Sequence, residues 1–157
     1  MSAWRPLRAD DLPGVGAVAD IVHPNSPEDD AVLLERLALY PAGCFALDRP
    51  TGLAGYLLSH PWHDGAAPKL NRMLGAIPAD AGTYYIHDLA LHPAAQGTGA
   101  AGTIIRRLLA ETAAFPRHAL VAVNGSSPFW SRFGFRPADG PDLTSYGGEA
   151  VYMVRAF

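Results

Sequence analysis

The spacing of hydrophobic and polar positions switches several times along the chain between the period of a helix and that of a strand. Apolar residues that gather on one helical face predict helices over 12–22, 27–40 and 99–114. Short apolar runs bounded by Gly or Pro predict strands over 4–8, 44–47, 53–60, 83–91, 118–123 and 148–157. A further short helix is expected after residue 125, with Gly134 at its end.

The order of these elements predicts one α+β domain over residues 1–157. Its sheet is expected to be mixed, mostly antiparallel and twisted, with six to seven strands flanked by about four helices. Asp10, Asp11 and Ser26 are suited to cap the first two helices. The segment 61–82 is a long loop rich in Pro and Gly, with one helical turn expected over 70–74, and such loops are often functional.

Composition and charge narrow the class of protein. Hydrophobic residues make up 49% of the chain, which is enough for a folded core and argues against disorder. The formal net charge of −3 argues against a nucleic-acid partner. Cys44 is the only cysteine, so no intramolecular disulfide can form. We see no secretory signal and no apolar run of membrane-spanning length, and therefore expect a cytoplasmic protein with no membrane partner.

The stretch "QGTGAAG" at 96–102 allows two interpretations. From Gly97 it spells G-x-G-x-x-G, the pattern of dinucleotide-binding loops. That pattern requires a strand directly before the first glycine and an acidic residue at the end of the next strand. Here "HPAAQ" lies between the strand and Gly97, and the residue after the next strand is Asn124. The context therefore argues against a nicotinamide or flavin dinucleotide.

From Gln96 the same stretch spells Q-x-x-G-x-A, between the strand that ends in Leu91-His92-Pro93 and an amphipathic helix. Downstream, "NGSSPFWSRFGF" combines a strand-ending Asn with an aromatic-x-x-x-G-F element. Together these two motifs resemble the GNAT superfamily of acyl-CoA-dependent N-acetyltransferases, and the resemblance covers essentially the whole chain. It implies a GNAT fold, acetyl-CoA as cosubstrate, a small-molecule amine as acceptor and a possible homodimer.

The resemblance also implies a binding site for CoA. Backbone N–H groups at a helix N-terminus, approached closely because of Gly97 and Gly99, suit a diphosphate. The pantetheine arm would lie along the strand 83–91, where a backbone N–H would polarise the thioester carbonyl. The residues implied are Leu89, Ala90, Leu91, Gln96, Gly97, Thr98, Gly99, Ala100, Ala101, Asn124, Phe129 and Trp130. The alternative is that the glycines only tighten a turn.

His87 is the first candidate for the base that deprotonates the amine. It stands where members with a "Y-L-E-D"-like strand carry a catalytic Glu, and the ordinary pKa of a histidine, about 6.5, suits a base near neutral pH. The alternative is a structural histidine bonded to Asp88 or to backbone. In a regular strand Asp88 would face away from His87, unless a bulge changes its direction.

Other candidates line the predicted acceptor side. Many members carry a Tyr at the position of Trp130 to protonate the leaving thiolate, and an indole cannot replace it. Tyr146 is therefore the candidate acid, unless the thiolate leaves without a protein acid. His60, Trp62 and Tyr85 are candidate acceptor contacts, His60 being a second candidate base. The pair of histidines at 60 and 63 lacks a further ligand at fixed spacing, so we expect no metal.

The residues leave three functions open. The first is an N-acetyltransferase that acts on a small amine by direct attack in a ternary complex. The second is a non-catalytic acyl-CoA-binding regulatory domain, which the absent Tyr at position 130 favours. The third is an acetyltransferase of a protein amine, against which the long 61–82 loop argues.

Overall fold

The computed structural model describes residues 3–156 and contains one seven-stranded sheet in the order β1-β2-β3-β4-β5-β7-β6. Neighbouring strands are antiparallel except β4 and β5, which are parallel. The strands are β1 (Trp4–Pro6), β2 (Cys44–Arg49), β3 (Gly52–Trp62), β4 (Thr83–Leu91), β5 (Arg117–Ala122), β6 (Arg136–Pro137) and β7 (Val151–Ala156). The helices are α1 (Leu12–Val22), α2 (Asp30–Leu39), α3 (Ala100–Glu111) and α4 (Ser127–Ser131). The predicted α+β fold and its number of strands are confirmed.

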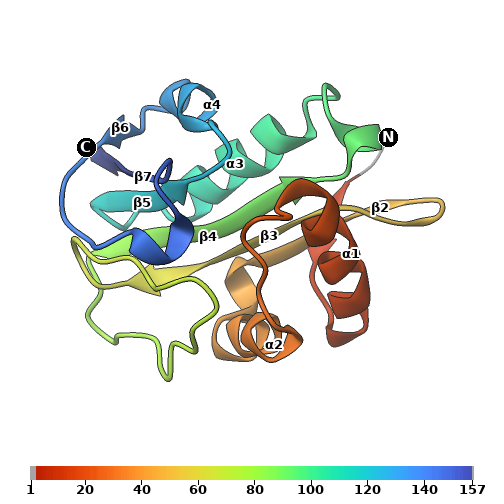
Figure 1. Cartoon of the computed structure of the whole chain (residues 1–157), viewed down its shortest axis with the longest axis horizontal. Coiled ribbons are helices and arrows are strands. Elements are labelled where there is room, and N and C mark those ends of the chain that lie inside the picture. Colours follow the sequence, from red (N-terminus) through yellow and green to blue (C-terminus); the bar gives the residue numbers. More distant parts are fainter. Residues whose placement is uncertain (1–2, 157) are drawn as a thin grey trace.

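The helices cover the two faces of the sheet in separate layers (Figure 1). On one face, Ile104, Ile105 and Leu108 of α3 pack with Trp130 of α4 and Phe135 in the larger core. On the other face, Val15 and Val18 of α1 and Leu33 of α2 pack on Tyr56 and Leu58 of β3. The sheet therefore separates two apolar cores, and β4 lies at its centre.

Several predicted boundaries are confirmed, notably 12–22, 83–91 and the hairpin of β2 and β3. The second helix begins at Asp30 rather than at residue 27, and Asp29 rather than Ser26 is its N-cap. No helical turn forms over 70–74. Both differences have one cause, which is that residues 28–35 bond to the 61–82 segment. The N–H of Asp29 donates to the Asn71 side chain, and Glu35 accepts the N–H groups that a helical turn would use.

Neither predicted Asp capped the first helix through its side chain. Asp11 instead accepts the guanidinium of Arg5 at 2.8 Å and the N–H of Arg8. These bonds hold the short turn before α1 and lower the pKa of Asp11, chiefly through the Arg5 hydrogen bond. A charged partner from β1 thus replaces the predicted cap.

Strand β4 has two structural irregularities that create the site. It pairs with β5 only from Thr83 to Ile86, so the two strands separate beyond that point. Against β3, Ile86 lies opposite Ser59 and Asp88 lies opposite Leu58, which leaves His87 as an extra, unpaired residue in a β-bulge. The bulge changes the alternation of side chains exactly where β4 leaves β5.

Within residues 3–156, none of the helices has both the length and the apolar character needed to span a membrane.

Candidate active site

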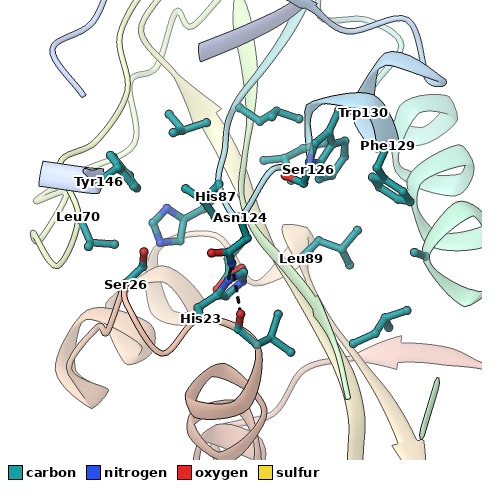
Figure 2. A pocket seen from close by; sticks show the side chains of 18 residues that line it. His23, Ser26, Leu70, His87, Leu89, Asn124, Ser126, Phe129, Trp130 and Tyr146 are labelled. Carbon is teal, nitrogen blue, oxygen red and sulfur yellow. Dashed lines mark hydrogen bonds and ion pairs between the residues drawn. The ribbon is translucent and has the colours of Figure 1, made fainter. Parts of the chain in front are cut away.

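A pocket occupies the gap where β4 and β5 separate (Figure 2). Its walls are apolar toward α3 and α4, with Leu89, Leu91, Phe129 and Trp130, and polar toward the α1–α2 loop. The full lining is Val22, His23, Ser26, Leu70, Ile86, His87, Asp88, Leu89, Leu91, Ala101, Leu120, Val121, Val123, Asn124, Ser126, Phe129, Trp130 and Tyr146. The pocket thus runs from the start of α3 to a polar end beside His87 and Tyr146.

One edge of β4 is open along this pocket. The N–H of His92 donates to Ala54 O on the β3 side at 2.8 Å. Because backbone groups of alternate residues point to opposite edges of a strand, those of Leu89 and Leu91 point into the gap. The Gln96 side-chain amide donates a hydrogen bond to the Leu91 carbonyl at 3.1 Å. The N–H groups of Leu89 and Leu91 are therefore directed at the place where the pantetheine arm was predicted.

The turn before α3 has the backbone expected of an anion-binding loop. Gly97 has φ +77° and Gly99, the N-cap of α3, has φ +84°, in the left-handed region that favours glycine. A Cβ at either position would meet no atom within 4 Å, so conformation and not crowding explains these glycines. In the part of the chain that the structure describes, the N–H groups of 97–99 donate to no acceptor. That of Gln96 donates to Pro93 O and that of Ala100 to Thr98.

The predicted contacts from the second motif line the pocket, whereas Thr98, Gly99 and Ala100 line a separate hollow. Trp130 is buried and packs edge-on against Phe129 and Phe135. Asn124 adopts φ +57° and its amide donates to Val22 O at 3.2 Å and lies 3.0 Å from His23 Nδ1. The side chain of Asn124 thus joins the end of β5 to the end of α1 across the pocket (Figure 2).

The bulge directs the His87 ring into the polar end of the pocket, on the side lined by Ser26, Leu70 and Tyr146 (Figure 2). Its side chain is 2% exposed, and Nε2 donates to Glu28 Oε1 at 2.7 Å. Among residues 3–156, Nδ1 has no hydrogen-bond partner. Burial raises the pKa of Glu28, but His87, the Asn71 N–H and the charge of Arg36 together outweigh burial and hold that pKa below its ordinary value. Glu28 is therefore the ionised partner of His87.

Asp88 faces the same side of the sheet as His87, because the bulge adds one residue to the strand. It accepts His23 Nε2–H at 2.8 Å and the Tyr56 hydroxyl at 2.5 Å. Burial lowers the pKa of His23, but the hydrogen bond and charge of Asp88 outweigh it and leave the pKa raised. The structural alternative had His87 bonded to Asp88 or to backbone, but His87 bonds to Glu28, and Asp88 anchors the end of α1.

Sequence reasoning assigned "HPNSPE" only a helix break and a cap at Ser26, and missed its part in the site. His23 and Ser26 line the pocket, and Glu28 supports it from behind. The available signal was the density of titratable and hydroxyl side chains in one short connection between helices.

Tyr146 lies at the pocket wall, as predicted, but its environment does not suit an acid. Its hydroxyl donates to Pro68 O at 2.7 Å, and burial raises its pKa to about 12. A thiol has an ordinary pKa near 8.5, so proton transfer from Tyr146 to a thiolate would be unfavourable. The structure therefore argues against Tyr146 as proton donor to the leaving group.

The three predicted acceptor contacts lie outside the pocket lining. His60 and Tyr85 are each 1% exposed and stack behind His87, with ring centroids 6.4 Å from it. Trp62 packs edge-on against His60 in a small separate core. His60 and Tyr85 support the His87 ring and Trp62 supports His60, and direct contact with an acceptor stays a prediction.

His60 gives a stability prediction. Burial lowers its pKa to about 3, below the ordinary 6.5, so from pH 6.5 downward the unfolded state binds a proton that the folded state does not. Acid therefore destabilises the fold through this residue, by about 2 kcal/mol between pH 7 and pH 5. Urea unfolding at both pH values measures this loss. Between pH 7 and pH 5, His60→Gln should lose about 2 kcal/mol less unfolding free energy than the parent. Equal pH sensitivity in the variant and the parent would contradict this.

The 61–82 segment closes the polar end of the pocket. On one side Leu70 N–H donates to Ser145 Oγ at 3.0 Å and Pro68 accepts the Tyr146 hydroxyl. On the other side Asn71 N–H donates to Glu28 Oε2 at 3.0 Å, and the buried Arg36 donates to Arg72 O. Figure 1 shows this yellow-to-green segment beside the blue segment before β7.

No group of three or more His, Cys, Asp or Glu side chains within 3–156 is arranged to hold a metal ion.

Comparison with known proteins identifies the family. Residues 3–135 match the model described as "Acetyltransferase (GNAT) family". A comparison with curated protein sequences gives no significant match.

Solved structures share the fold at low sequence identity. The loading GNATL domain of CurA from Lyngbya majuscula superposes with a TM-score of 0.84 at 12% identity, covering 99% of this chain and 98% of that one. The GphF GNAT-like decarboxylase in complex with isobutyryl-CoA has a TM-score of 0.78 at 16% identity, covering 98% of both chains. Ard1 from Thermoplasma volcanium has a TM-score of 0.74 at 13% identity, covering 99% of this chain and 97% of that one.

Proposed function

The chain belongs to the acetyltransferase (GNAT) family, and from this premise we propose that it transfers an acetyl group from acetyl-CoA to the amine of a small molecule. The observation that carries the proposal is the pocket between β4 and β5, which runs from Ala101, just after the glycine turn, to a buried histidine. We also propose that the protein is located in the cytoplasm.

The residues present fit acyl-CoA in three respects. The amides of 97–99, at the start of α3, have no acceptor among the described residues and suit a diphosphate. The open edge of β4 at Leu89 and Leu91 offers backbone N–H groups to the pantetheine amides. The apolar wall of Phe129 and Trp130 excludes water from the thioester. When bound, acetyl-CoA supplies the electrophilic carbonyl.

His87 then acts on the acceptor. As the amine nitrogen forms a bond to the carbonyl carbon, its proton passes to His87 directly or through a water. The C–S bond breaks and CoA leaves as the thiolate, without a proton from Tyr146. The Leu89 or Leu91 N–H stabilises the charge that develops on the carbonyl oxygen.

The closed polar end favours a small acceptor over a protein amine. A peptide would need an open groove between the α1–α2 loop and the segment before β7, and the 61–82 segment bridges these two by hydrogen bonds. A small amine needs no such groove. This contact pattern is the support for the choice of acceptor.

A screen of amines tests the proposal. Release of CoA from acetyl-CoA would be followed with a thiol reagent for arylalkylamines, polyamines, amino acids and peptides with a free N-terminus or lysine. We expect turnover with a small amine and none with the peptides. Binding of acetyl-CoA without turnover of any amine would favour the non-catalytic acyl-CoA-binding domain, and turnover of a peptide would contradict the small acceptor.

One observation favours a second reaction. Glu28 and Asp88, the carboxylates at the polar end, are both engaged by histidines, so neither is available to hold an ammonium group. GphF is described as a GNAT-like decarboxylase. In such a reaction the bond from Cα to the carboxylate of a carboxyacyl-CoA breaks, CO₂ leaves, and a proton replaces it on Cα. Conversion of malonyl-CoA to acetyl-CoA without any amine would favour this reaction.

A further inference from the structure

The Glu28 carboxylate links the candidate base to the segment that closes the pocket. Oε1 accepts His87 Nε2–H at 2.7 Å, and Oε2 accepts Asn71 N–H at 3.0 Å. Only 8% of the Glu28 side chain is exposed. Glu28 comes from the loop between α1 and α2, so one buried side chain joins three separate parts of the molecule.

These contacts determine which nitrogen of His87 is basic. An ionised carboxylate can only accept hydrogen bonds, so Nε2 must carry a hydrogen. In the neutral ring the lone pair then lies on Nδ1, which has no partner among the described residues. The rings of His60 and Tyr85, each 6.4 Å from the His87 centroid, hold the imidazole in place.

We propose that Glu28 is a positioning residue that holds His87 in the Nε2–H tautomer, with Nδ1 as the atom that takes the acceptor's proton. Asn71 fixes the carboxylate by binding its second oxygen. The catalytic half of this inference rests on the proposed function of His87, whereas the tautomer does not.

The backbone N–H of Asn71 makes Glu28→Gln a sharp test of the His87 tautomer. A backbone N–H needs an oxygen acceptor, so the Gln amide must turn its oxygen to Asn71 and its NH₂ to His87. The reverse orientation would set two donors against each other and leave a buried N–H without an acceptor. The NH₂ group can bond only to an unprotonated Nε2, so the hydrogen of His87 moves to Nδ1. Nδ1 is then no longer a base.

The experiment is ¹⁵N NMR of the histidine rings in the full chain, combined with the rate of CoA release. We expect the Nε2–H tautomer in the parent protein and Nδ1–H in Glu28→Gln. With the fastest amine of the screen, kcat should fall about 100-fold or more, as for loss of a general base, while the KM for acetyl-CoA changes little. Glu28→Asp keeps a carboxylate, and it should retain the Nε2–H tautomer and recover part of the rate.

Glu35→Gln is the matched control, because Glu35 also accepts N–H groups of the 61–82 segment, from Leu74 and Gly75, but does not contact His87. It should keep the Nε2–H tautomer. An unchanged tautomer in Glu28→Gln, or the same change in Glu35→Gln, would overturn the proposal. A changed tautomer with an unchanged rate would support the positioning by Glu28 and overturn His87 as the base. If Glu28→Gln does not fold, loss of Nε2–H in Glu28→Asp would overturn the proposal and its retention would support it.

Discussion

Replacing Gly99 by Glu is expected to reduce the affinity for acetyl-CoA about 10³-fold, because two like charges about 4 Å apart near a protein surface repel by roughly 4 kcal/mol. Gly99 is the N-cap of α3, and the amides beside it have no acceptor within the described residues. A Glu carboxylate there would both repel the diphosphate and bond to the amides meant for it. Titration calorimetry with acetyl-CoA measures the loss.

Gly99→Gln separates charge from backbone strain. Gln has nearly the same size as Glu and the same difficulty at φ +84°, but no charge. Strain of about 1–2 kcal/mol should weaken binding by at most about 30-fold. The difference between the two variants therefore reports the charge alone. If Gly99→Glu bound acetyl-CoA as tightly as the parent, the turn at 96–101 would not hold the diphosphate.

Replacing His87 by Gln is expected to lower kcat about 10²- to 10⁴-fold, the usual contribution of a general base, with little change in acetyl-CoA affinity. Gln fills a similar volume and can still donate to Glu28, so the change removes the basic nitrogen and little else. A rate that depends on a general base varies with pH, and the variant should lack the part of that variation that the base gives the parent. Initial rates across the pH range measure both effects.

His63→Gln is the control, because His63 stacks on Trp62 outside the pocket lining and should keep the parent profile. The groups that face His87 and can alter its profile are Glu28, His60, Tyr85 and Tyr146. The same pH dependence in His87→Gln and the parent would remove His87 as the base.

Local patterns in the sequence predict the elements whose hydrogen bonds and packing are local. The strand 83–91 and the helix 12–22 have their predicted boundaries because the apolar period and the flanking Pro or Gly agree. The turn at 97–99 is predicted from its glycines, but for another reason: the sequence argument relied on close approach of a phosphate, whereas the structure shows a left-handed backbone at Gly97 and Gly99.

The parts that sequence reasoning missed depend on contacts between distant segments. The second helix starts late because Asp29 bonds to Asn71, 42 residues away in the chain. Glu28 and His23 enter the site only because the α1–α2 loop folds over β4, where they meet His87 and Asp88. No local pattern contains these pairs. The prediction that His60 contacts the acceptor did not account for its burial. Alternation along a strand shows which face of the sheet a side chain is on, but not how far it lies from the surface.

The bulge at His87 divides β4 into two halves. In one half the even-numbered side chains face the α3 core, and in the other half the odd-numbered side chains do. Before the bulge, Tyr84 and Ile86 pack into the α3 core, and after it Leu89 packs into the same core, although a regular strand would turn Leu89 to the other face. The residue at the joint has no partner across the ladder, so neither half depends on its identity. The side chain at position 87 can therefore vary without changing the pairing of β3 with either half of β4.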